Sequence, residues 1–374
     1  MQIYLGPVLS GFLGCGLKCD GWVNIVKALF VAAMHDLSVK SRGFSYEYYN
    51  LFQPLERVVD SVIAFDFMEI LQERGREQMN QILLETVIRE RPDLAIVVPY
   101  TDQLIPEVMD EIKQHTPTVA YFFDDMWRVE YSRFWANHFT FITTSDADGV
   151  RKFREVDHSN VIYSPFACNQ YVFVKKELPK KYDVSFVGQY HPHRAWYLRQ
   201  LKRAGIAVHV WGAGWGTERL SQDDMVNVFN QSRINLNLSN CVSWDVRYLL
   251  ELNRPVKETL RTWRGTFRAL REPDTKVREQ VKGRHFEINA CGGFQLSYYV
   301  EGLERHYEIG SEIALYSSPE ELVEKIRYYL KYEDERKAIA QRGYVRAVRE
   351  HTMEQRFRQI FERTGLPVLR PDNK

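Results

Sequence analysis

The sequence predicts an α/β protein made of two domains, each a parallel sheet covered by helices on both faces. Short apolar runs alternate with segments of helical periodicity, which is typical of parallel sheets. This alternation fades across residues 164–181, where Pro and Lys accumulate, and restarts at residue 182. A chain of 374 residues, of which 45% are hydrophobic, is long enough to bury two cores. We therefore expect one domain over residues 1–170 and a second over residues 171–350.

The expected elements of the first domain are strands and helices in alternation. Residues 1–6 predict a short strand that runs into a glycine-rich loop, and residues 22–37 carry apolar side chains at helical spacing. Further along, we expect strands at 61–67, 94–100, 118–123 and 139–145, and helices at 69–91 and 103–114. The carboxyl ends of such strands meet at one edge of the sheet, where α/β proteins bind their ligands.

The second domain repeats the pattern from residue 182. Residues 182–215 predict a strand, a glycine turn, a helix, a second strand and a second glycine turn. We also expect strands at 233–239, 293–299 and 312–318, a helix opening within 283–292, and a pair of amphipathic helices over 319–365. Residues 245–280 are rich in arginine and lack a strand pattern, so we interpret them as an insertion at the edge of the cleft. This insertion is either a binding surface for an anionic acceptor or a partner, or a solvated surface helix.

Charge and apolar content exclude several classes of function. Lys and Arg number 50 against 49 Asp and Glu, so the chain lacks the net positive charge of a dedicated nucleic-acid binder. No run approaches the roughly 18 to 20 apolar residues of a membrane span, and the first residues lack the pattern of a signal peptide. We expect a cytoplasmic protein with no nucleic-acid partner and at most peripheral contact with a membrane.

The five cysteines are scattered and odd in number, unlike the frameworks of secreted disulfide-rich proteins, so we expect reduced thiols. Cys15 and Cys19 could form half of a metal site, but no second Cys or His pair with suitable spacing follows them. The sequence therefore predicts no metal site.

The stretch EQVKGRHFEINACGGFQL, residues 279–296, gathers groups that suit a phosphorylated ligand. A helix beginning near Gly283 places Lys282 and Arg284 at its start, where the partial positive charge and unpaired N–H groups of a helix N-terminus favour phosphate. We expect a diphosphate to bind there.

Two carboxylates and two glycines complete the stretch. Glu287, about one turn into the helix, could accept hydrogen bonds from a ribose, and Glu279, just before the helix, could accept them from a sugar. Gly292 and Gly293 would let the backbone come close to a ligand. In the alternative interpretation, the charges pair with one another on the surface and the two glycines only form a turn.

The loop GPVLSGFLGCGLKCDG, residues 6–21, holds more glycines than a tight turn needs. Such a loop lets backbone N–H groups approach a ligand, so we expect Gly14, Gly16 and Lys18 to contact the substrate, with Asp20 as the other charged member. The loop is not a P-loop, because no Gly-Lys-Ser/Thr ends it.

The segment YFFDDMWR ends an expected strand with two adjacent carboxylates, Asp124 and Asp125. Mutual repulsion would raise the pKa of one of them and help it to act as a base. Alternatively, one of them caps a helix that begins at Met126.

The segments KGRHFEINACGGFQL, SEIALYSSPEELVEKIRYYL and EHTMEQRF resemble the C-terminal half of the CgeB/YkvP-type spore-protein glycosyltransferases, members of the GT-B group. VSFVGQYHPHR is similar to the first strand and loop of the family's nucleotide domain, VWGAGW to its second glycine turn, and SRINLNLS to the strand before the donor site. The resemblance covers roughly residues 180–360. It implies the GT-B fold, in which two Rossmann-like domains face each other across a cleft, the first binding an acceptor and the second a nucleotide-sugar. Residues 351–374 would then comprise a helix that crosses back to the first domain, and a tail.

The same resemblance implies roles for site residues. The spacing of Glu279 and Glu287 looks like the E-x7-E signature of retaining GT-B enzymes, which implies that Glu287 holds the nucleotide ribose and Glu279 contacts the donor sugar. Lys282 and Arg284 would then contact the diphosphate. The usual spacer is a glycine-rich, aromatic loop, whereas this chain has QVKGRHF.

Further donor contacts are implied for the two glycine turns. Gly188 and Gly212 fall in these turns, and Arg194 is the expected phosphate partner, with His191 and His193 as less favoured ones. In inverting relatives the general base often lies in the first loop, which makes Asp20 a candidate catalytic residue. In many retaining relatives a histidine stands near the position that Asp124 and Asp125 occupy here.

Together these features predict a hexosyltransferase-like enzyme. It would move a sugar from a nucleotide-diphosphate donor, UDP- or GDP-linked, to a glycan, lipid-linked, protein or metabolite acceptor, without a metal and without a tightly bound cofactor. The E-x7-E spacing favours retention, whereas Asp20 or Asp124 acting as a base would favour inversion; we predict retention. Two alternatives stay open: an epimerase or phosphorylase on the same fold, and a catalytically silent nucleotide- or sugar-binding protein of surface assembly.

Overall fold

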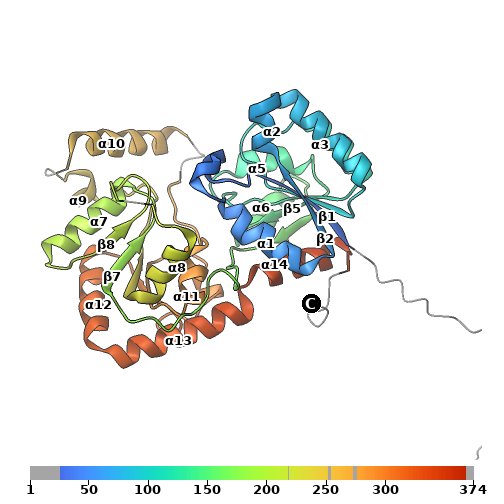
Figure 1. Ribbon diagram of the computed structural model, residues 1–374. Helices are drawn as coiled ribbons and strands as arrows, with labels where there is room; N and C mark the ends of the chain where they lie inside the picture. The colour runs from blue at the N-terminus through green and yellow to red at the C-terminus, as the bar shows by residue number, and fades with distance from the viewer. Residues whose placement is uncertain (1–25, 218, 252–253, 273–275, 368–374) are drawn as a thin grey trace, which may run out of the picture.

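The computed structural model describes residues 26–217, 219–251, 254–272 and 276–367, and these form two α/β domains side by side (Figure 1). The strand expected at residues 1–6 and the glycine-rich loop with Gly14, Gly16, Lys18 and Asp20 lie outside the described residues. Among the helices in those ranges, none has the length and apolar content needed to span a membrane.

The first domain is built on a six-stranded sheet with the order β2-β1-β3-β4-β5-β6, in which all neighbours are parallel. The strands are β1 (Lys27–Ala32), β2 (Ser61–Asp66), β3 (Leu94–Val97), β4 (Thr118–Ala120), β5 (Phe141–Thr144) and β6 (Val161–Tyr163). Side chains of β1 alternate between two cores, Leu29 and Val31 on one face and Ala28 and Phe30 on the other. A strand buried on both faces in this way forms the middle of the sheet.

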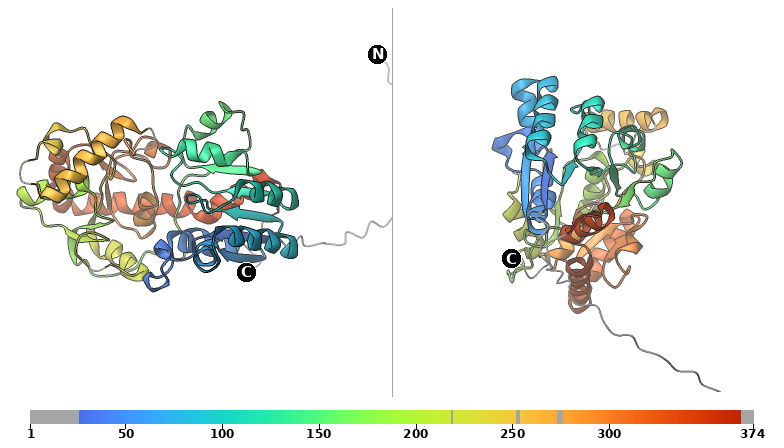
Figure 2. Two further views of the ribbon diagram at one scale, coloured as in Figure 1. Left: turned by 90° about the horizontal axis from the view of Figure 1, so that it is seen from above. Right: turned by 90° about the vertical axis from the view of Figure 1, so that its right-hand side faces the viewer.

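The helices of the first domain cover both faces of this sheet (Figures 1 and 2). They are α1 (Gln53–Val58), α2 (Phe67–Arg74), α3 (Arg76–Glu90), α4 (Pro106–His115), α5 (Val129–Ala136) and α6 (Gly149–Arg154), with the short helices η1 (Asp36–Ser38), η2 (Lys40–Arg42) and η3 (Tyr48–Phe52).

The second domain has a five-stranded parallel sheet with the order β11-β10-β9-β7-β8. Its strands are β7 (Tyr182–Val187), β8 (His209–Trp211), β9 (Ser232–Asn237), β10 (Gln295–Tyr298) and β11 (Ala314–Tyr316). Its helices are α7 (Pro192–Arg203), α8 (Gln222–Gln231), α9 (Val246–Leu249), α10 (Val256–Arg271), α11 (Arg284–Ala290), η4 (Leu303–Arg305), α12 (Pro319–Lys331) and α13 (Glu333–Glu350).

Both sheets reverse their strand order at the same place. The first strand of each domain, β1 or β7, lies between the second and the third strand of that domain. Helices that follow strands on the two sides of such a switch point lie on opposite faces, which leaves a crevice at the carboxyl ends of the strands. The fold therefore provides one crevice in each domain.

The last helix, α14 (Met353–Thr364), packs against the first domain although it follows the second in sequence (Figure 1). Met353, Phe357, Ile360 and Phe361 are fully buried in the same cluster as Phe30 of β1. Beside its start, the Met353 N–H donates to the Cys168 carbonyl over 2.9 Å. The chain thus crosses between the domains twice, once near Cys168 and once at the start of α14.

Three expectations about the elements are wrong. The described part of residues 22–37 does not form the expected helix; it contains β1, a strand so deeply buried that apolar residues occupy successive positions and imitate helical spacing. The helix expected at 69–91 is divided at Gly75, whose φ of 83° ends α2 and precedes α3. Residues 319–365 form three helices, α12, α13 and α14, rather than two.

Candidate active site

Two adjoining cavities, of about 390 and 460 Å³, lie between the domains. The first is lined by Tyr46 and Tyr121 to Asp125 of the first domain and by Gly188 and Lys282 of the second. The second extends along the loop after β8. Five residues line both cavities and mark where they join: Tyr46, Val187, Gly188, Arg284 and Glu287. Cavities of this size suit small organic ligands.

Two glycine turns form the second-domain wall of the cavities. Gly188 follows β7, and its N–H donates to the carbonyl of Trp211 over 2.9 Å. Gly212 follows β8 with φ of 134°, and a Cβ added to it would lie 2.2 Å from the Gly188 carbonyl oxygen. Glycine is therefore required at residue 212, because only a bare backbone lets the two turns approach this closely.

Glu287 and Arg284 lie at the junction of the two cavities. Glu287, on the first turn of α11, is 1% exposed, and Arg284 donates a hydrogen bond to its carboxylate. Burial raises the pKa of Glu287, while Arg284 opposes that shift. The Tyr46 hydroxyl approaches from the first domain, and a Cβ added to Gly283 would lie 2.9 Å from both this hydroxyl and Glu287 Oε1. Among the described residues the Tyr46 hydroxyl has no hydrogen-bond partner, so it is free to bind a ligand.

Lys282 and Gln280 connect the domains across the cleft. Lys282 Nζ lies 3.2 Å from Asp124 Oδ1, and Gln280 Nε2 donates to the Phe123 carbonyl over 2.5 Å. Both contacts join the segment before α11 to the residues that follow β4. The structure thus brings together seven of the predicted site residues in the lining of the first cavity: Asp124, Asp125, Gly188, Arg194, Lys282, Arg284 and Glu287.

The two adjacent aspartates differ in their surroundings. Asp124 is partly exposed in the cleft, with 35% of its side chain accessible. Asp125 is 2% exposed; it accepts hydrogen bonds from the Ser145 hydroxyl over 2.7 Å and from the Thr144 hydroxyl. Burial raises the pKa of Asp125 to about 6, although these hydrogen bonds oppose the shift. Asp124 can therefore reach a ligand directly, whereas Asp125 fixes the loop after β5 to the loop after β4.

Glu279 lies beside the cleft and is held by its own partners. Its carboxylate accepts from the Asn240 N–H over 2.8 Å and pairs with Lys276 Nζ at 2.5 Å. Burial alone would raise the pKa of Glu279, but Lys276 and hydrogen bonds from Ser239 and Asn240 bring it down to about 2. Glu279 lines a cavity of about 50 Å³ together with Asn237 and Lys282, and another of about 470 Å³ together with His193 and Tyr298. It is thus near the site but lines neither of the two adjoining cavities.

Arg194 and the two histidines of the donor loop have mainly structural contacts. Arg194 lines the first cavity and donates to the carbonyls of Leu238 and Gln189 over 3.0 and 2.9 Å. Burial lowers the pKa of Arg194 to about 10, while the Glu279 carboxylate opposes that shift. His191 caps α7 by accepting from the His193 N–H. His193 is buried and stacks on Trp196, with ring centroids 5.8 Å apart.

The pair Gly292 and Gly293 lies at the opposite end of α11 from Arg284. Gly292 has φ of 67°, and a Cβ added to it would lie 2.9 Å from the Lys175 side chain. Gly293 packs closely against Asn235. Both positions need glycine for the turn between α11 and β10, and the structure places them away from Glu287.

Two residues of the cleft have no counterpart in the sequence prediction, Tyr46 and Asn237. Asn237 ends β9 and lines the first cavity; its side-chain nitrogen is buried without a hydrogen-bond partner among the described residues. Such an unpaired donor costs roughly 1 to 3 kcal/mol unless a ligand satisfies it. Asn237 is a polar residue within the otherwise apolar strand segment INLNLS, and this is a signal that the sequence offers. Tyr46 lies about 240 residues from Glu287 in sequence, and only the fold brings these two residues together.

The arrangement can hold an anion and a polyol side by side. Lys282, Arg284 and Arg194 supply positive charge, and the buried carboxylate of Glu287 is an acceptor for the hydroxyls of a ligand. Within the described ranges, no three His, Cys, Asp or Glu side chains gather closely enough to hold a metal ion.

Comparison with known proteins finds a family match for part of the chain and solved structures with the same fold. Residues 193–362 match a protein family described as glycosyl transferase-like. A sequence search of curated proteins finds no match. The chain is similar in structure to sucrose-phosphate synthase from Thermosynechococcus elongatus, with a TM-score of 0.61 and 9% identity over 91% of this chain and 99% of that chain.

Two further solved structures are similar to this chain over almost the whole length of the other protein. A glycosyltransferase from Rickettsia africae gives a TM-score of 0.58 at 10% identity, over 91% of this chain and 97% of that chain. Anabaena HepE in complex with UDP-glucose gives a TM-score of 0.56 at 10% identity, over 91% of this chain and 99% of that chain. The predicted fold class is confirmed: the chain has the two-domain GT-B fold of these proteins.

Proposed function

We propose that the protein is a glycosyltransferase that moves a sugar from a nucleotide-diphosphate donor, bound by the second domain, to an acceptor bound by the first. The observation that carries this proposal is the buried carboxylate of Glu287 at the junction of two cavities, with Arg284 and Lys282 beside it. A buried carboxylate flanked by cations matches the hydroxyls and phosphates of a nucleoside diphosphate.

The donor would extend through both cavities. The base would enter the second cavity beside Gly212 and Ala213, and the ribose hydroxyls would bond Glu287. The diphosphate would then lie against the Gly188 turn within reach of Arg284 and Lys282, which leaves the sugar in the first cavity near Asn237. Binding of UDP-glucose by HepE, which shares the fold, supports a UDP donor.

The acceptor would approach from the first domain. Aromatic side chains of the first cavity, including Tyr46, Tyr100 and Tyr131, offer faces on which a sugar ring can stack. This lining favours a glycan or a glycosylated lipid or protein as acceptor. The segments that resemble those of CgeB/YkvP-type glycosyltransferases support, as part of this proposal, an enzyme of that type.

Transfer would proceed without a metal and with retention of configuration. Lys282, Arg284 and Arg194 line the cavity in which the leaving diphosphate would develop its charge, so they can take the part of a divalent cation. Asp124 forms an ion pair with Lys282, and the buried Asp125 accepts a hydrogen bond from the Ser145 hydroxyl. Neither carboxylate is therefore free to act as a general base. A mechanism in which the leaving phosphate accepts the proton of the acceptor hydroxyl suits such a site.

The proposal is tested by calorimetric titration of UDP, GDP and their sugar conjugates into wild type and Glu287→Gln. We expect one nucleotide diphosphate to bind wild type and the variant to bind it roughly tenfold to a hundredfold more weakly, because a charged hydrogen bond is worth about 1.5 to 3 kcal/mol. Glu324→Gln, at an exposed position of α12, is the matched control and should bind like wild type.

A second variant covers the case in which Glu287→Gln fails to fold. Lys282 is 33% exposed in its side chain, so Lys282→Ala should fold normally. It should weaken binding of the diphosphate while leaving binding of the corresponding nucleoside unchanged. Equal binding by all variants, or binding of no nucleotide by wild type, would overturn the donor-site assignment.

A further inference from the structure

Helix α10 carries its apolar stripe on the side that faces solvent. Val256, Leu260, Phe267 and Leu270 recur at spacings of three, four and seven residues, and they are 76, 66, 55 and 67% exposed. Trp263 lies within the same stripe, and its ring contacts Phe267 with centroids 6.0 Å apart. An amphipathic helix of a globular domain normally turns such a stripe toward the core.

The side of α10 that faces the protein is polar. Glu258, Thr262 and Thr266 are its buried residues. Glu258 accepts from Arg199 Nη2 over 2.6 Å and from the Tyr190 hydroxyl over 2.8 Å, and Thr262 lies 3.2 Å from the Tyr248 hydroxyl.

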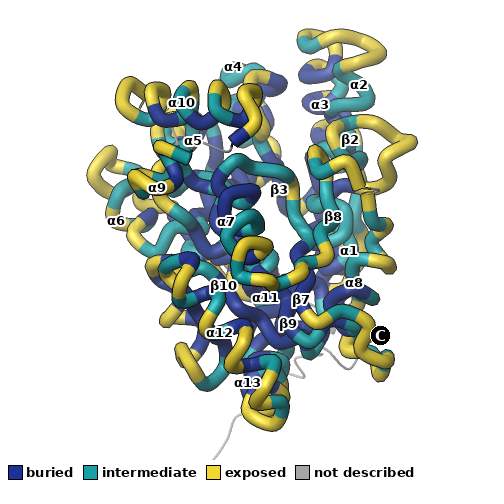
Figure 3. The backbone as a smooth tube through the Cα atoms, turned by 90° about the vertical axis from the view of Figure 1, so that its left-hand side faces the viewer, coloured by how far each residue is buried: buried dark blue, intermediate teal, exposed yellow. Residues whose placement is uncertain are grey.

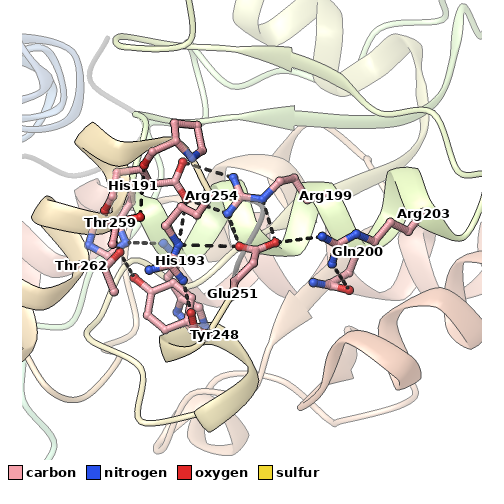
Figure 4. Close-up of polar contacts among 12 residues, drawn as sticks. His191, His193, Arg199, Gln200, Arg203, Tyr248, Glu251, Arg254, Thr259 and Thr262 are labelled. Carbon is pink, nitrogen blue, oxygen red and sulfur yellow. Dashed lines mark hydrogen bonds and ion pairs between the residues drawn. The ribbon is translucent and has the colours of Figure 1, made fainter.

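Neighbouring residues complete this buried network. Arg199 and Arg254 also contact Glu251, at 2.5 and 3.7 Å, as Figure 4 shows. Rotating α10 to bury its apolar stripe would remove Glu258 from Arg199 and Arg254 and leave these two cations with Glu251 alone. The orientation of the helix is therefore fixed, and Figure 3 shows exposed and buried segments alternating along it.

Each apolar residue of the stripe is followed directly by a cation. The pairs are Val256-Lys257, Leu260-Arg261, Trp263-Arg264, Phe267-Arg268 and Leu270-Arg271. Among the described residues, only Arg268 of these five cations has a carboxylate partner, Glu272. The exposed half of α10 thus combines an apolar stripe with a row of cations whose charge is largely uncompensated.

We propose that α10 binds the surface of a membrane that contains anionic phospholipids. An apolar stripe with an aromatic residue, bordered by Lys and Arg, is the pattern of a helix that lies in the interface plane of a bilayer. Anionic headgroups complement the charge, and each cation near such a surface strengthens the binding. A second copy of the chain would bring the same cations to the contact, so charge complementarity favours lipid.

Binding through α10 would place the donor loop near the membrane. Tyr190, two residues after Gly188, bonds Glu258 of α10, and the Arg261 guanidinium lies 5.8 Å from the Tyr190 ring centroid. The helix lies along one edge of the second domain (Figure 1). This inference rests on α10 alone and stands apart from the proposed sugar transfer.

Co-sedimentation with lipid vesicles tests the proposal. The full chain is mixed with vesicles of phosphatidylcholine alone, or of phosphatidylcholine and phosphatidylglycerol in equal parts. We expect binding to the anionic vesicles, much weaker binding to the neutral ones, and loss of binding at high salt. Leu260→Gln with Phe267→Gln, and separately Lys257→Glu with Arg264→Glu, should each reduce partitioning by roughly tenfold or more.

Helix α3 offers a matched control. Ile88 and Arg89 form an exposed apolar and basic pair there, 46% exposed for Ile88 and 67% for the Arg89 side chain. Ile88→Gln with Arg89→Glu should leave vesicle binding unchanged. Absence of binding to anionic vesicles, or equal binding by wild type and the α10 variants, would overturn the proposal. Light scattering on wild type and on Leu260→Gln with Phe267→Gln tests whether a second copy of the chain covers the stripe. Self-association that is lost in the variant, without lipid binding, would also overturn the proposal.

Nucleotide titration of the same variants separates this inference from the proposed function. The α10 substitutions lie outside the two adjoining cavities between the domains. Nucleotide affinity should therefore stay at the wild-type value while vesicle binding falls.

Discussion

At Gly212 the two glycine turns of the second domain approach each other closely. The Gly212 backbone has φ of 134°, and the Gly188 carbonyl occupies the space that a side chain would need. Gly216 in the same loop also has a positive φ, 78°, but an added Cβ there would meet nothing within 4 Å. Substitutions at these two glycines therefore distinguish the effect of backbone strain, present at both, from the effect of the close approach of the loops, present only at Gly212.

We predict that Gly212→Ala weakens nucleotide binding, because the added methyl group pushes the loop after β8 away from the Gly188 turn. Gly216→Ala should show only the backbone strain, about 1 to 2 kcal/mol of stability. The affinity of Gly212→Ala for the nucleotide should fall about tenfold below that of Gly216→Ala, which corresponds to about 1.4 kcal/mol. Calorimetric titration of both variants measures the difference, and equal affinities would show that the loops need not touch.

His193 makes folding stability depend on pH. Burial lowers its pKa from 6.5 to about 4 in the folded chain, with Glu279 opposing. Below pH 6.5 the unfolded histidine takes up a proton that the folded one does not, so its contribution is present above pH 6.5 and is lost as the pH falls toward 4. Each pH unit in this window removes about 1.4 kcal/mol. Asp125, with its pKa raised to about 6 by burial, has the opposite effect: its protonated form favours folding as the pH falls.

We predict that His193→Phe reduces the acid sensitivity, since it keeps a ring against Trp196 and Tyr248 and removes the titrating group. Urea unfolding is measured at two pH values about 1.5 units apart, both between the unfolded pKa of 6.5 and the folded pKa of about 4. On acidification, this variant should lose about 1 to 2 kcal/mol less free energy of unfolding than wild type loses. His115→Phe, at an exposed position of α4, is the control and should keep the wild-type loss. An unchanged loss in His193→Phe would mean that His193 is charged when folded.

At the level of the elements, periodicity predicted the strands that alternate with clear helices and failed where burial was complete. β2, β3 and β7 lie where the sequence placed strands, because turns and helices border them. The apolar spacing of the β1 segment predicts a helix, since a strand buried on both faces loses the alternation that identifies it. In the insertion, the sequence alone shows the arginines of α10. It does not show that the polar side of α10 is buried, because this depends on the contact of Glu258 with Arg199, which lies far away in sequence.

The candidate site was predictable to the extent that it is local. Lys282, Arg284 and Glu287 share one short segment, so helix geometry alone placed them together. Asn237 ends β9 of the same domain, and only the strand order brings it to the cavity that Glu287 lines, whereas Tyr46 reaches that cavity through the domain arrangement. Gly292 and Gly293 looked like ligand contacts because a turn at the far end of α11 needs the same residue type as a ligand-binding loop.

Helix α14 belongs energetically to the first domain. Phe357 is fully buried beside Tyr121, with ring centroids 6.4 Å apart. We predict that Phe357→Ala destabilises the first domain by about 3 to 5 kcal/mol, the usual range for removing a buried aromatic ring. Gln359→Ala, at an exposed position of the same helix, should change stability by less than about 0.5 kcal/mol. Urea unfolding of both variants measures this, and similar stabilities would mean that α14 does not hold the first domain.

On the scale of the whole molecule, the two domains contact each other at the rim of the cleft. Gln280 to the Phe123 carbonyl and Lys282 to Asp124 close one side, and Arg219 pairs with Asp36 on the other. These contacts lie on both sides of the junction at Glu287. Such an arrangement can exclude water from a reactive donor once it is bound, which limits its hydrolysis.

If this cleft transfers a sugar, as we propose, the protein must turn over a nucleotide-sugar. NMR would follow UDP-glucose and GDP-mannose incubated with the protein and a panel of saccharide acceptors, with and without EDTA. We predict release of one nucleotide diphosphate, unchanged by EDTA, with a product that keeps the anomeric configuration of the donor. Glu287→Gln should release it at least about tenfold more slowly, and Glu324→Gln at the wild-type rate. Nucleotide binding without any release would contradict the claim and indicate a silent binding protein, whereas an inverted product would contradict only the predicted retention.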